Sequence, residues 1–201
     1  MAVFRLPAIP AELEWRLDPV EWAIEQGSGL SIRAGAMTDL FIDPKDGRKQ
    51  DAAPAALFAP PDGAFMLSAR VTVGFSSTYD AGVLHVRVSD DHWAKLCFEY
   101  SPQGEPMVVS VVNRGVSDDC NSVVVQGKTA WLRVSQGETA TAFHCSLDGK
   151  RWSFVRHFAL GSLVGLRVGF SSQSPTGKGC RSEFSDIRYM AGFPRDLRSG
   201  E

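Results

Sequence analysis

The 201-residue chain lacks long hydrophobic runs and clusters of positive charge. No apolar stretch approaches the roughly 20 residues that a membrane-spanning helix needs. The net charge of −2 argues against general affinity for nucleic acid or anionic membrane, since both require clustered lysine and arginine. Arg5, Pro7 and Pro10 interrupt the region where a secretory signal has an unbroken apolar segment. We therefore expect a cytoplasmic protein without nucleic-acid or membrane partners.

Cysteines are also few and widely spaced. Cys97, Cys120, Cys145 and Cys180 form no Cys-x-x-Cys pair and have no nearby histidine, which argues against a zinc site. Cys97 and Cys145 fall within expected strands, where a free thiol behaves as a small hydrophobic side chain. The pattern predicts four reduced cysteines, with no metal and no cofactor bound.

Familiar catalytic signatures are missing as well. The chain has no Gly-x-Ser-x-Gly, no phosphate-binding Gly-x-x-x-x-Gly-Lys and no His-Glu-x-x-His. The segment from Ser146 to Trp152 is similar to the Asp-box hairpin of sialidases. It occurs once and lacks the residue expected between Asp148 and Gly149, so we interpret it as a hairpin with a tryptophan cap. No catalytic residue is assigned.

What the sequence does contain is an alternation of apolar and other residues from Ala64 to Tyr189. Apolar residues occupy every second position from Phe65 to Phe75, with Ser68, Arg70 and Thr72 among those between. Successive strand residues point to opposite sides, so this period of two indicates one buried and one solvated face. Strands are predicted at 64–75, 81–89, 92–100, 106–113, 121–126, 129–135, 139–147, 151–159, 164–172 and 180–190.

About ten short antiparallel strands with little helix predict an all-β sandwich of two sheets, because a single sheet would leave one face bare. A bulge near Ser185 and Asp186 would bring both Phe184 and Ile187 into the core. The expected buried residues are Phe65, Leu67, Val71, Val73, Leu84, Val86, Leu96, Phe98, Leu132, Val134, Phe143, Leu166, Val168 and Phe170.

The N-terminal part is less regular. Trp22 and Ile24 alternate before a Gln-Gly-Ser-Gly turn, and Leu30 and Ile32 alternate after it, which predicts a hairpin. Residues 38–63 carry turn residues and several prolines, and we expect a long surface excursion with one helical turn. Loops of that length are often functional. No linker separates two cores, so residues 1–201 are predicted to form one domain with a core at about 15–190.

Polar side chains gather on one face of two predicted neighbouring strands. Alternation places His85 and Arg87 on the same side as Trp93, Lys95 and Glu99. Such a face is either a solvated surface, where each cross-strand ion pair contributes under about 1 kcal/mol, or a ligand-binding concavity. In the second case the ring would stack on a sugar or base, and the charged groups would bind hydroxyls or an anion.

These same strands carry a family resemblance. The runs from Tyr79 to Arg87 and from Trp93 to Tyr100 resemble an uncharacterised concanavalin A-like family named for a regulator of enolase. Further similar segments are Thr38-Asp39, Asp43 to Gly47, Val116 to Asp119, Ser146 to Gly149, Ser174 to Gly177 and Phe184 to Asp186. The resemblance extends over about residues 15–190. It implies a jelly-roll sandwich of two curved antiparallel sheets, related to lectins and glucanases.

The resemblance singles out the polar positions Asp39, Asp43, Asp80, Arg87, Trp93, Lys95, Glu99 and Asp118. Combined with the strand alternation, the expected ligand-binding residues are Asp39, Asp43, His85, Arg87, Trp93, Lys95, Glu99 and Asp118. Because Lys95 lies beside Glu99 on the strand, we expect the ionised form of that carboxyl to be favoured. Calcium is common in lectin-like sandwiches, but Asp39 and Asp43 alone supply fewer oxygens than such an ion requires.

Three functions stay open. The first is a non-catalytic protein that binds a carbohydrate or another small polar ligand on the concave sheet. The second is a regulator that acts through a protein partner such as a metabolic enzyme. The third is an enzyme of glycoside-hydrolase type, which usually needs two carboxylates on either side of the bond. The shape of the surface around Glu99 distinguishes them, because a groove favours a small ligand and a flat face favours a protein.

Overall fold

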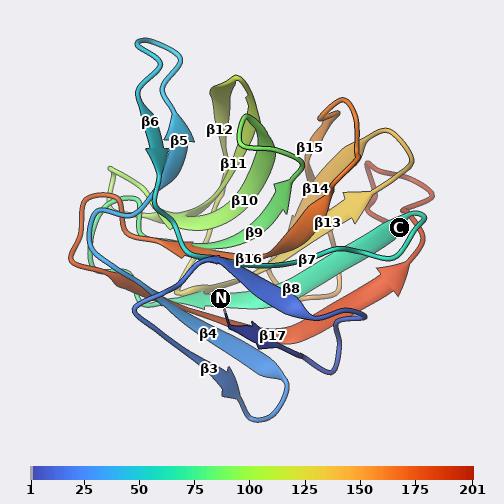
Figure 1. Cartoon of the computed structure of the whole chain (residues 1–201), viewed down its shortest axis with the longest axis horizontal. Coiled ribbons are helices and arrows are strands. Elements are labelled where there is room, and N and C mark those ends of the chain that lie inside the picture. Colours follow the sequence, from blue (N-terminus) through green and yellow to red (C-terminus); the bar gives the residue numbers. More distant parts are fainter. Residues whose placement is uncertain (1) are drawn as a thin grey trace.

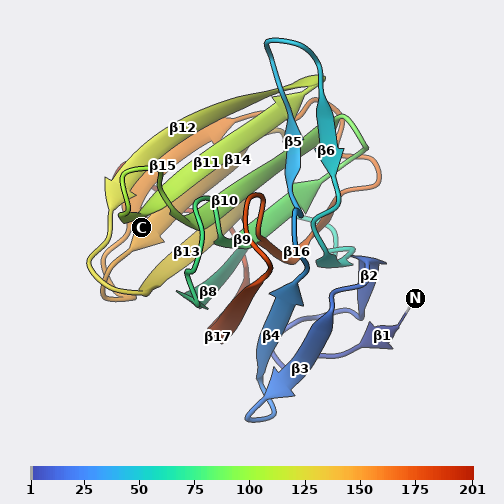
Figure 2. The same ribbon diagram turned by 90° about the vertical axis from the view of Figure 1, so that its left-hand side faces the viewer.

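The computed structural model describes residues 2–201 and consists of β-strands joined by turns (Figure 1). Two large antiparallel sheets pack face to face, and a separate two-stranded hairpin projects from them (Figures 1 and 2). The expected all-β, two-sheet jelly-roll sandwich is confirmed. The described residues contain no helix with the length and hydrophobicity of a membrane span.

The first sheet, here called sheet A, has eight strands. In spatial order they are β1 (Val3–Phe4), β2 (Leu13–Leu17), β7 (Ala55–Phe58), β16 (Arg167–Gln173), β9 (Ala81–Arg87), β10 (His92–Tyr100), β11 (Pro106–Arg114) and β12 (Val116–Val124).

The second sheet, sheet B, has seven strands. In spatial order they are β15 (Ser153–Phe158), β14 (Thr141–Ser146), β13 (Thr129–Gln136), β8 (Phe65–Val73), β17 (Cys180–Ala191), β4 (Gly29–Ala34) and β3 (Glu21–Glu25). The projecting hairpin consists of β5 (Leu40–Ile42) and β6 (Lys49–Asp51).

The layer between the sheets is filled by the residues that the alternation marked as apolar. Strand β8 shows the rule most clearly, since its odd-numbered residues are buried and its even-numbered ones are half-buried. Thirteen of the fourteen residues expected in the core are buried. Leu166 is the exception. It packs against the core but is only partly buried, because it lies just before β16 begins.

The predicted bulge is present in β17. The pairing of β17 with β8 shifts between Ser185 and Arg188, and Asp186 takes a φ of 48°. The extra residue lets Phe184 and Ile187, three positions apart, both face the core, where they are 1% and 8% exposed. The four cysteines are free, and Cys120 is the exposed one.

The expectation of a long surface excursion at residues 38–63 holds only for the first part, where β5 and β6 form the projecting hairpin. The segment contains no helical turn, and it ends in the strand β7. Strand β7 lies inside sheet A between β2 and β16 and is buried along its whole length. Both faces of β7 are covered, so its sequence is a continuous apolar run that does not alternate. The short strand β2 was also missed, and β12 begins at Val116 instead of 121.

We predict that Gly169→Ala strongly destabilises the sandwich. A Cβ atom at Gly169 would lie 2.0 Å from the backbone oxygen of Ala56 on the paired strand β7. A central strand can relieve such a clash only by separating from its neighbour, which we expect to cost about 2 kcal/mol or more. Thermal and urea unfolding measure the effect.

Gly74→Ala is the matched control, because the nearest atom to its Cβ would be the backbone oxygen of Arg181 at 3.5 Å, an ordinary contact. If the two variants had the same unfolding free energy, the close approach of β16 to β7 would be contradicted.

Candidate functional site

Strands β9 and β10 present one polar face on the side of sheet A that turns away from sheet B. Trp93 pairs with Arg87 and Lys95 with His85, so these four side chains share that face. Their neighbours Ala94 and Leu96 point the other way, into the core between the sheets. We call this surface the outer face of sheet A.

The β5–β6 hairpin stands over this outer face and is tied to it by specific contacts. The backbone N–H of Ile42 donates to Oγ of Ser117 on β12 at 2.9 Å. The ring of Trp93 packs against Leu40, Ile42, Ala53 and Val111 in a small apolar cluster. The hairpin therefore forms a wall along one side of the sheet.

A hollow of about 320 Å³ lies between the hairpin and the sheet. Its floor comes from β10, β11, β12 and β16, and its wall comes from the hairpin and the residues leading into it, with Tyr79 added from the loop before β9. The lining residues are Asp39, Phe41, Asp43, Arg48, Gln50, Tyr79, Lys95, Glu99, Val109, Val111, Asp119 and Gln173. We call this hollow the cleft.

The ammonium group of Lys95 is the buried cation of the cleft, with the side chain 4% exposed. Nζ donates to Oε1 of Gln173 at 2.9 Å and to Oδ1 of Asp39 at 3.2 Å. Burial acts to lower the pKa of Lys95, but Asp39, followed by Cys97 and Glu99, outweighs it, and the pKa is raised. Lys95 therefore stays charged and joins β10 to both the hairpin and β16.

The partners of Lys95 are themselves held in place. Oδ1 of Asp39 also accepts the N–H of Leu40 at 2.7 Å. A bridge between Thr38 and Ser174 fixes the segment leading into the hairpin to the end of β16, directly after Gln173. The cleft is thus organised before any ligand arrives.

Asp80, one of the positions singled out by the resemblance, is fully buried behind the cleft. One carboxylate oxygen accepts bonds from the backbone of Ser76 and Ser77, and the other accepts the hydroxyl of Ser174 at 2.6 Å. Asp80 therefore orders the loop that carries Tyr79 and does not face a ligand.

Glu99 is the acid on the cleft floor. Burial raises its pKa to about 7, with Asp39 and Asp119 adding to the rise and Lys95 opposing it. The expectation that Lys95 would favour the ionised form is therefore wrong, because the cost of desolvation exceeds the attraction of the cation. Within residues 2–201 the carboxyl of Glu99 makes no side-chain hydrogen bond or ion pair, so it is open to a ligand.

Asp119, and not Asp118, lines the cleft. Asp119 pairs with Val111, which pairs with Lys95, so these residues form one row across the outer face. Asp118 points to the opposite side, where it forms an ion pair with Arg156 at 2.9 Å. Alternation puts Asp119 on the same face as Ser117, but only the structure shows that Ser117 contacts the hairpin and that this face lines the cleft.

Trp93 and His85 lie beneath the cleft. Trp93 is 0% exposed and offers no ring face to a ligand, contrary to the expected stacking role. The imidazole of His85 meets that indole edge-on, with ring centroids 6.4 Å apart. Burial, aided by Arg87, Arg16 and Lys95, holds the pKa of His85 well below its usual value, so the ring is neutral.

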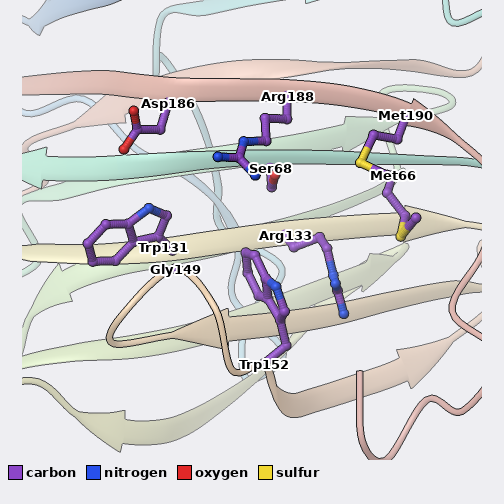
Figure 3. A pocket seen from close by; sticks show the side chains of 9 residues that line it. All are labelled: Met66, Ser68, Trp131, Arg133, Gly149, Trp152, Asp186, Arg188 and Met190. Carbon is purple, nitrogen blue, oxygen red and sulfur yellow. The ribbon is translucent and has the colours of Figure 1, made fainter. Parts of the chain in front are cut away.

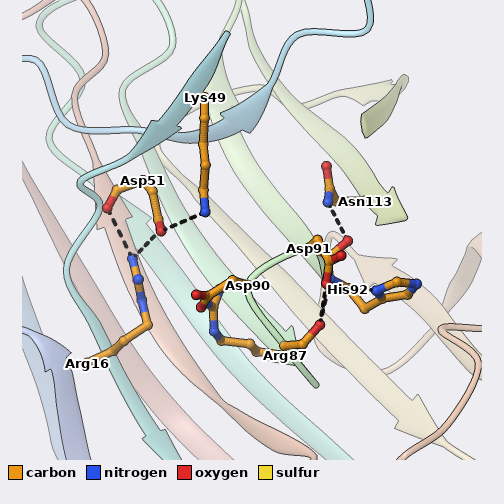
Figure 4. Close-up of polar contacts among 9 residues, drawn as sticks. Arg16, Lys49, Asp51, Arg87, Asp90, Asp91, His92 and Asn113 are labelled. Carbon is orange, nitrogen blue, oxygen red and sulfur yellow. Dashed lines mark hydrogen bonds and ion pairs between the residues drawn. The ribbon is translucent and has the colours of Figure 1, made fainter. Parts of the chain in front are cut away.

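Arg87 lies beyond the cleft in a second polar group (Figure 4). It forms an ion pair with Asp90 of the β9–β10 turn. Nearby, Arg16 contacts Asp51 at 2.6 Å, and Asp51 also contacts Lys49. Of the eight expected site residues, the cleft therefore brings together Asp39, Asp43, Lys95 and Glu99 and leaves out His85, Arg87, Trp93 and Asp118.

No cluster of three or more histidine, cysteine, aspartate or glutamate side chains suited to a metal ion occurs in residues 2–201. Asp39 and Asp43 do line the same cleft, but Asp39 is engaged by Lys95 and Oδ1 of Asp43 accepts the backbone N–H of Lys45 at 2.8 Å. These two carboxylates of the cleft are therefore engaged in hydrogen bonds within the protein.

We predict that Glu99→Gln changes how stability depends on pH. The folded-state pKa of about 7 lies above the ordinary value of 4.5. The stability contributed by the protonated carboxyl is thus fully present below about pH 4.5 and is lost as pH rises through 7, amounting to about 3 kcal/mol. The variant lacks this loss. The difference in unfolding free energy between the variant and the parent, measured by urea unfolding, should therefore shift in favour of the variant from pH 4.5 to 8.

The exposed residue Glu138 in the β13–β14 turn gives the matched control variant Glu138→Gln. Parallel pH profiles for the parent and Glu99→Gln would contradict the assignment of the raised pKa to Glu99.

Comparison with known proteins places the chain among relatives of similar fold. Regulation of enolase protein 1 of Saccharomyces cerevisiae is 35% identical over 130 residues, which cover 56% of this chain and 64% of that protein. The chain thus matches less than two thirds of this curated relative. A structure described as a functionally unknown protein from Saccharomyces cerevisiae has a TM-score of 0.80 and 26% identity, covering 90% of this chain and 97% of that one.

The GH43 BlXynB protein of Bacillus licheniformis has a TM-score of 0.70 at 18% identity, covering 89% of this chain but 37% of that one, and shows a shared fold. A family model described as "Protein of unknown function (DUF1349)" matches residues 15–191. Its extent agrees closely with the resemblance found in the motifs. The chain therefore belongs to this family of proteins of unknown function.

Proposed function

We propose that the chain binds a carbohydrate or another small hydroxyl-rich ligand in the cleft, without transforming it. The supporting observation is the shape of the surface around Glu99, a hollow of about 320 Å³ walled by the β5–β6 hairpin. This volume lies at the lower end of the range for small-molecule sites. A flat face would instead have favoured a protein partner.

The chemistry of the lining supports a ligand with several hydroxyl groups. Glu99 and Asp119 supply carboxyl oxygens, and Arg48 and Gln50 supply N–H donors from the hairpin. A sugar hydroxyl both donates and accepts, so it can bond to two such groups at once. Phe41 and Tyr79 add ring surface for the C–H groups of the same ligand.

Glycoside cleavage is the second candidate, and the pKa of Glu99 is the observation that favours it. A general acid must hold a proton near neutral pH, which a pKa of about 7 permits. The second carboxylate would be Asp39 or Asp119. Asp39 is already paired with Lys95, which leaves Asp119 as the freer acid. The order of the two candidates therefore depends on measured turnover.

A protein partner is the remaining alternative. Its support is the name of the yeast relative, which refers to regulation of enolase. Regulation through a metabolic enzyme does not require an acid and a cation arranged inside a hollow, so the cleft favours the small ligand.

We predict that Glu99→Gln and Tyr79→Ala each weaken oligosaccharide binding at least tenfold, because each removes a contact from the cleft. A tenfold loss corresponds to about 1.4 kcal/mol. Isothermal titration calorimetry with xylotriose, cellotriose and maltotriose measures the affinities. Glu138→Gln, outside the cleft, should bind like the parent.

The same proteins are incubated with aryl glycosides in parallel. Turnover by the parent that disappears in Glu99→Gln would contradict the binding proposal and support glycoside cleavage as the function. Absence of binding to all three oligosaccharides would contradict the proposal and favour a protein partner, which a pull-down with purified enolase then tests.

A further inference from the structure

A second hollow lies on the outer face of sheet B, on the side of the sandwich away from the cleft. It measures about 240 Å³ and is lined by Met66, Ser68, Trp131, Arg133, Gly149, Trp152, Asp186, Arg188 and Met190 (Figure 3). Pairing across three strands brings the polar members together, since Ser68 on β8 lies between Arg133 on β13 and Arg188 on β17. Residues distant in sequence thus converge at one place.

Two indole rings form the aromatic wall of this hollow. Trp131 and Trp152 are half-buried, whereas Trp15 and Trp93 are almost wholly buried in the interior. Trp152 follows the β14–β15 turn, in the hairpin that the sequence predicted at Ser146 to Trp152. The two rings therefore keep part of their surface available.

Neighbouring groups hold these rings in position. The guanidinium of Arg133 lies 4.3 Å from the centroid of Trp152, and that of Arg70 lies 5.5 Å from the centroid of Trp131. Gly149 fits closely against Trp131, since a Cβ there would lie 2.8 Å from its Nε1. Cation–π contacts and close packing make the aromatic wall rigid.

The charged side chains around the rings differ in whether they already have a hydrogen-bond partner in the protein. Burial lowers the pKa of Arg133 to about 10, and its Nε has no hydrogen-bond partner, although Nη2 donates to the backbone oxygen of Gly200 at 2.6 Å. Arg188 and Asp186 are exposed, and neither side chain has a hydrogen bond or ion pair within residues 2–201. Figure 3 shows the side chain of Arg188 extending toward Ser68.

The bulge in β17 belongs to this hollow. Asp186 takes a φ of 48°, which is uncommon for a residue other than glycine. The bulge keeps Phe184 and Ile187 in the core and places Asp186 on the outer face. Bulges and strained residues occur often at binding sites, where they direct a side chain toward a ligand.

We propose that this hollow binds a carboxylated sugar, a hexuronic acid residue, through Trp131, Trp152, Asp186 and Arg188. The indole faces pack on the C–H face of a pyranose ring. The guanidinium fork of Arg188 matches a carboxylate, with Arg70 and Arg133 adding positive charge. Asp186 accepts the ring hydroxyls.

The combination of indole rings, arginines and an aspartate in this hollow favours an acidic sugar over an aromatic carboxylate and over a neutral sugar. An aromatic carboxylate would use the rings and Arg188 but would leave the carboxylate of Asp186 desolvated without a partner. A neutral sugar would satisfy Asp186 but leave the three arginines without a counter-charge. A ring with both hydroxyls and a carboxylate engages all of them.

Trigalacturonic acid serves as the probe, with maltotriose as the neutral comparison. We expect trigalacturonic acid to quench tryptophan fluorescence, and we expect Arg188→Gln to leave any maltotriose binding, which belongs to the cleft, unchanged. Raising the salt concentration should weaken trigalacturonate binding, because charge attraction contributes. Trp152→Ala and Arg188→Gln should each reduce its affinity at least tenfold, and Asp186→Asn should also weaken it.

Glu138→Gln, outside both hollows, is the control and should leave trigalacturonate binding unchanged. Arg188 is exposed, so Arg188→Gln tests the site even if Trp152→Ala does not fold. No binding of trigalacturonate, or binding that survives Arg188→Gln, would overturn the proposal. Loss of trigalacturonate binding in Glu99→Gln alone would place the acidic sugar in the cleft and also overturn it.

Discussion

The apolar layer between the two sheets is the constraint on which the rest of this molecule depends. Each sheet turns one face inward, where Leu84, Leu96 and Phe170 of sheet A meet Leu67, Val71 and Leu132 of sheet B. Burial of this layer supplies the main driving force for folding. Because side chains alternate along a strand, the same burial assigns every second residue to an outer face. The charged side chains that line the two hollows therefore lie on the two outer faces.

On the outer face of sheet A, this assignment forces charged groups to share a confined space under the β5–β6 hairpin. The ammonium of Lys95 is tolerated there because Asp39 and Gln173 accept its hydrogen bonds. Glu99 has no such partner and responds by holding its proton more tightly, with a pKa of about 7. A carboxyl that lacks a protein partner inside a hollow is available to an external one. The binding proposal rests on this contrast between a satisfied cation and an unsatisfied acid.

Sequence reasoning succeeded where alternation was the signal. It identified the sandwich, nearly all the tested core residues and the bulge at Asp186, because burial of one face imposes a period of two. It failed for β7, whose two buried faces remove that period. In the site, alternation put Trp93 and Lys95 on one face, but it could not show that Leu40 and Ile42 would cover the indole. Burial beneath a non-local hairpin also reversed the expected pKa shift of Glu99.

The central claim, that the cleft of sheet A receives a small hydroxyl-rich ligand, is tested most directly by NMR. Amide chemical shifts of the labelled protein are followed during titration with the oligosaccharide that binds most tightly. The account predicts saturable changes that cluster at the lining residues of β10 and of the β5–β6 hairpin, around Lys95, Glu99 and Gln50. Saturable changes located elsewhere, with the shifts of these residues constant, would contradict it.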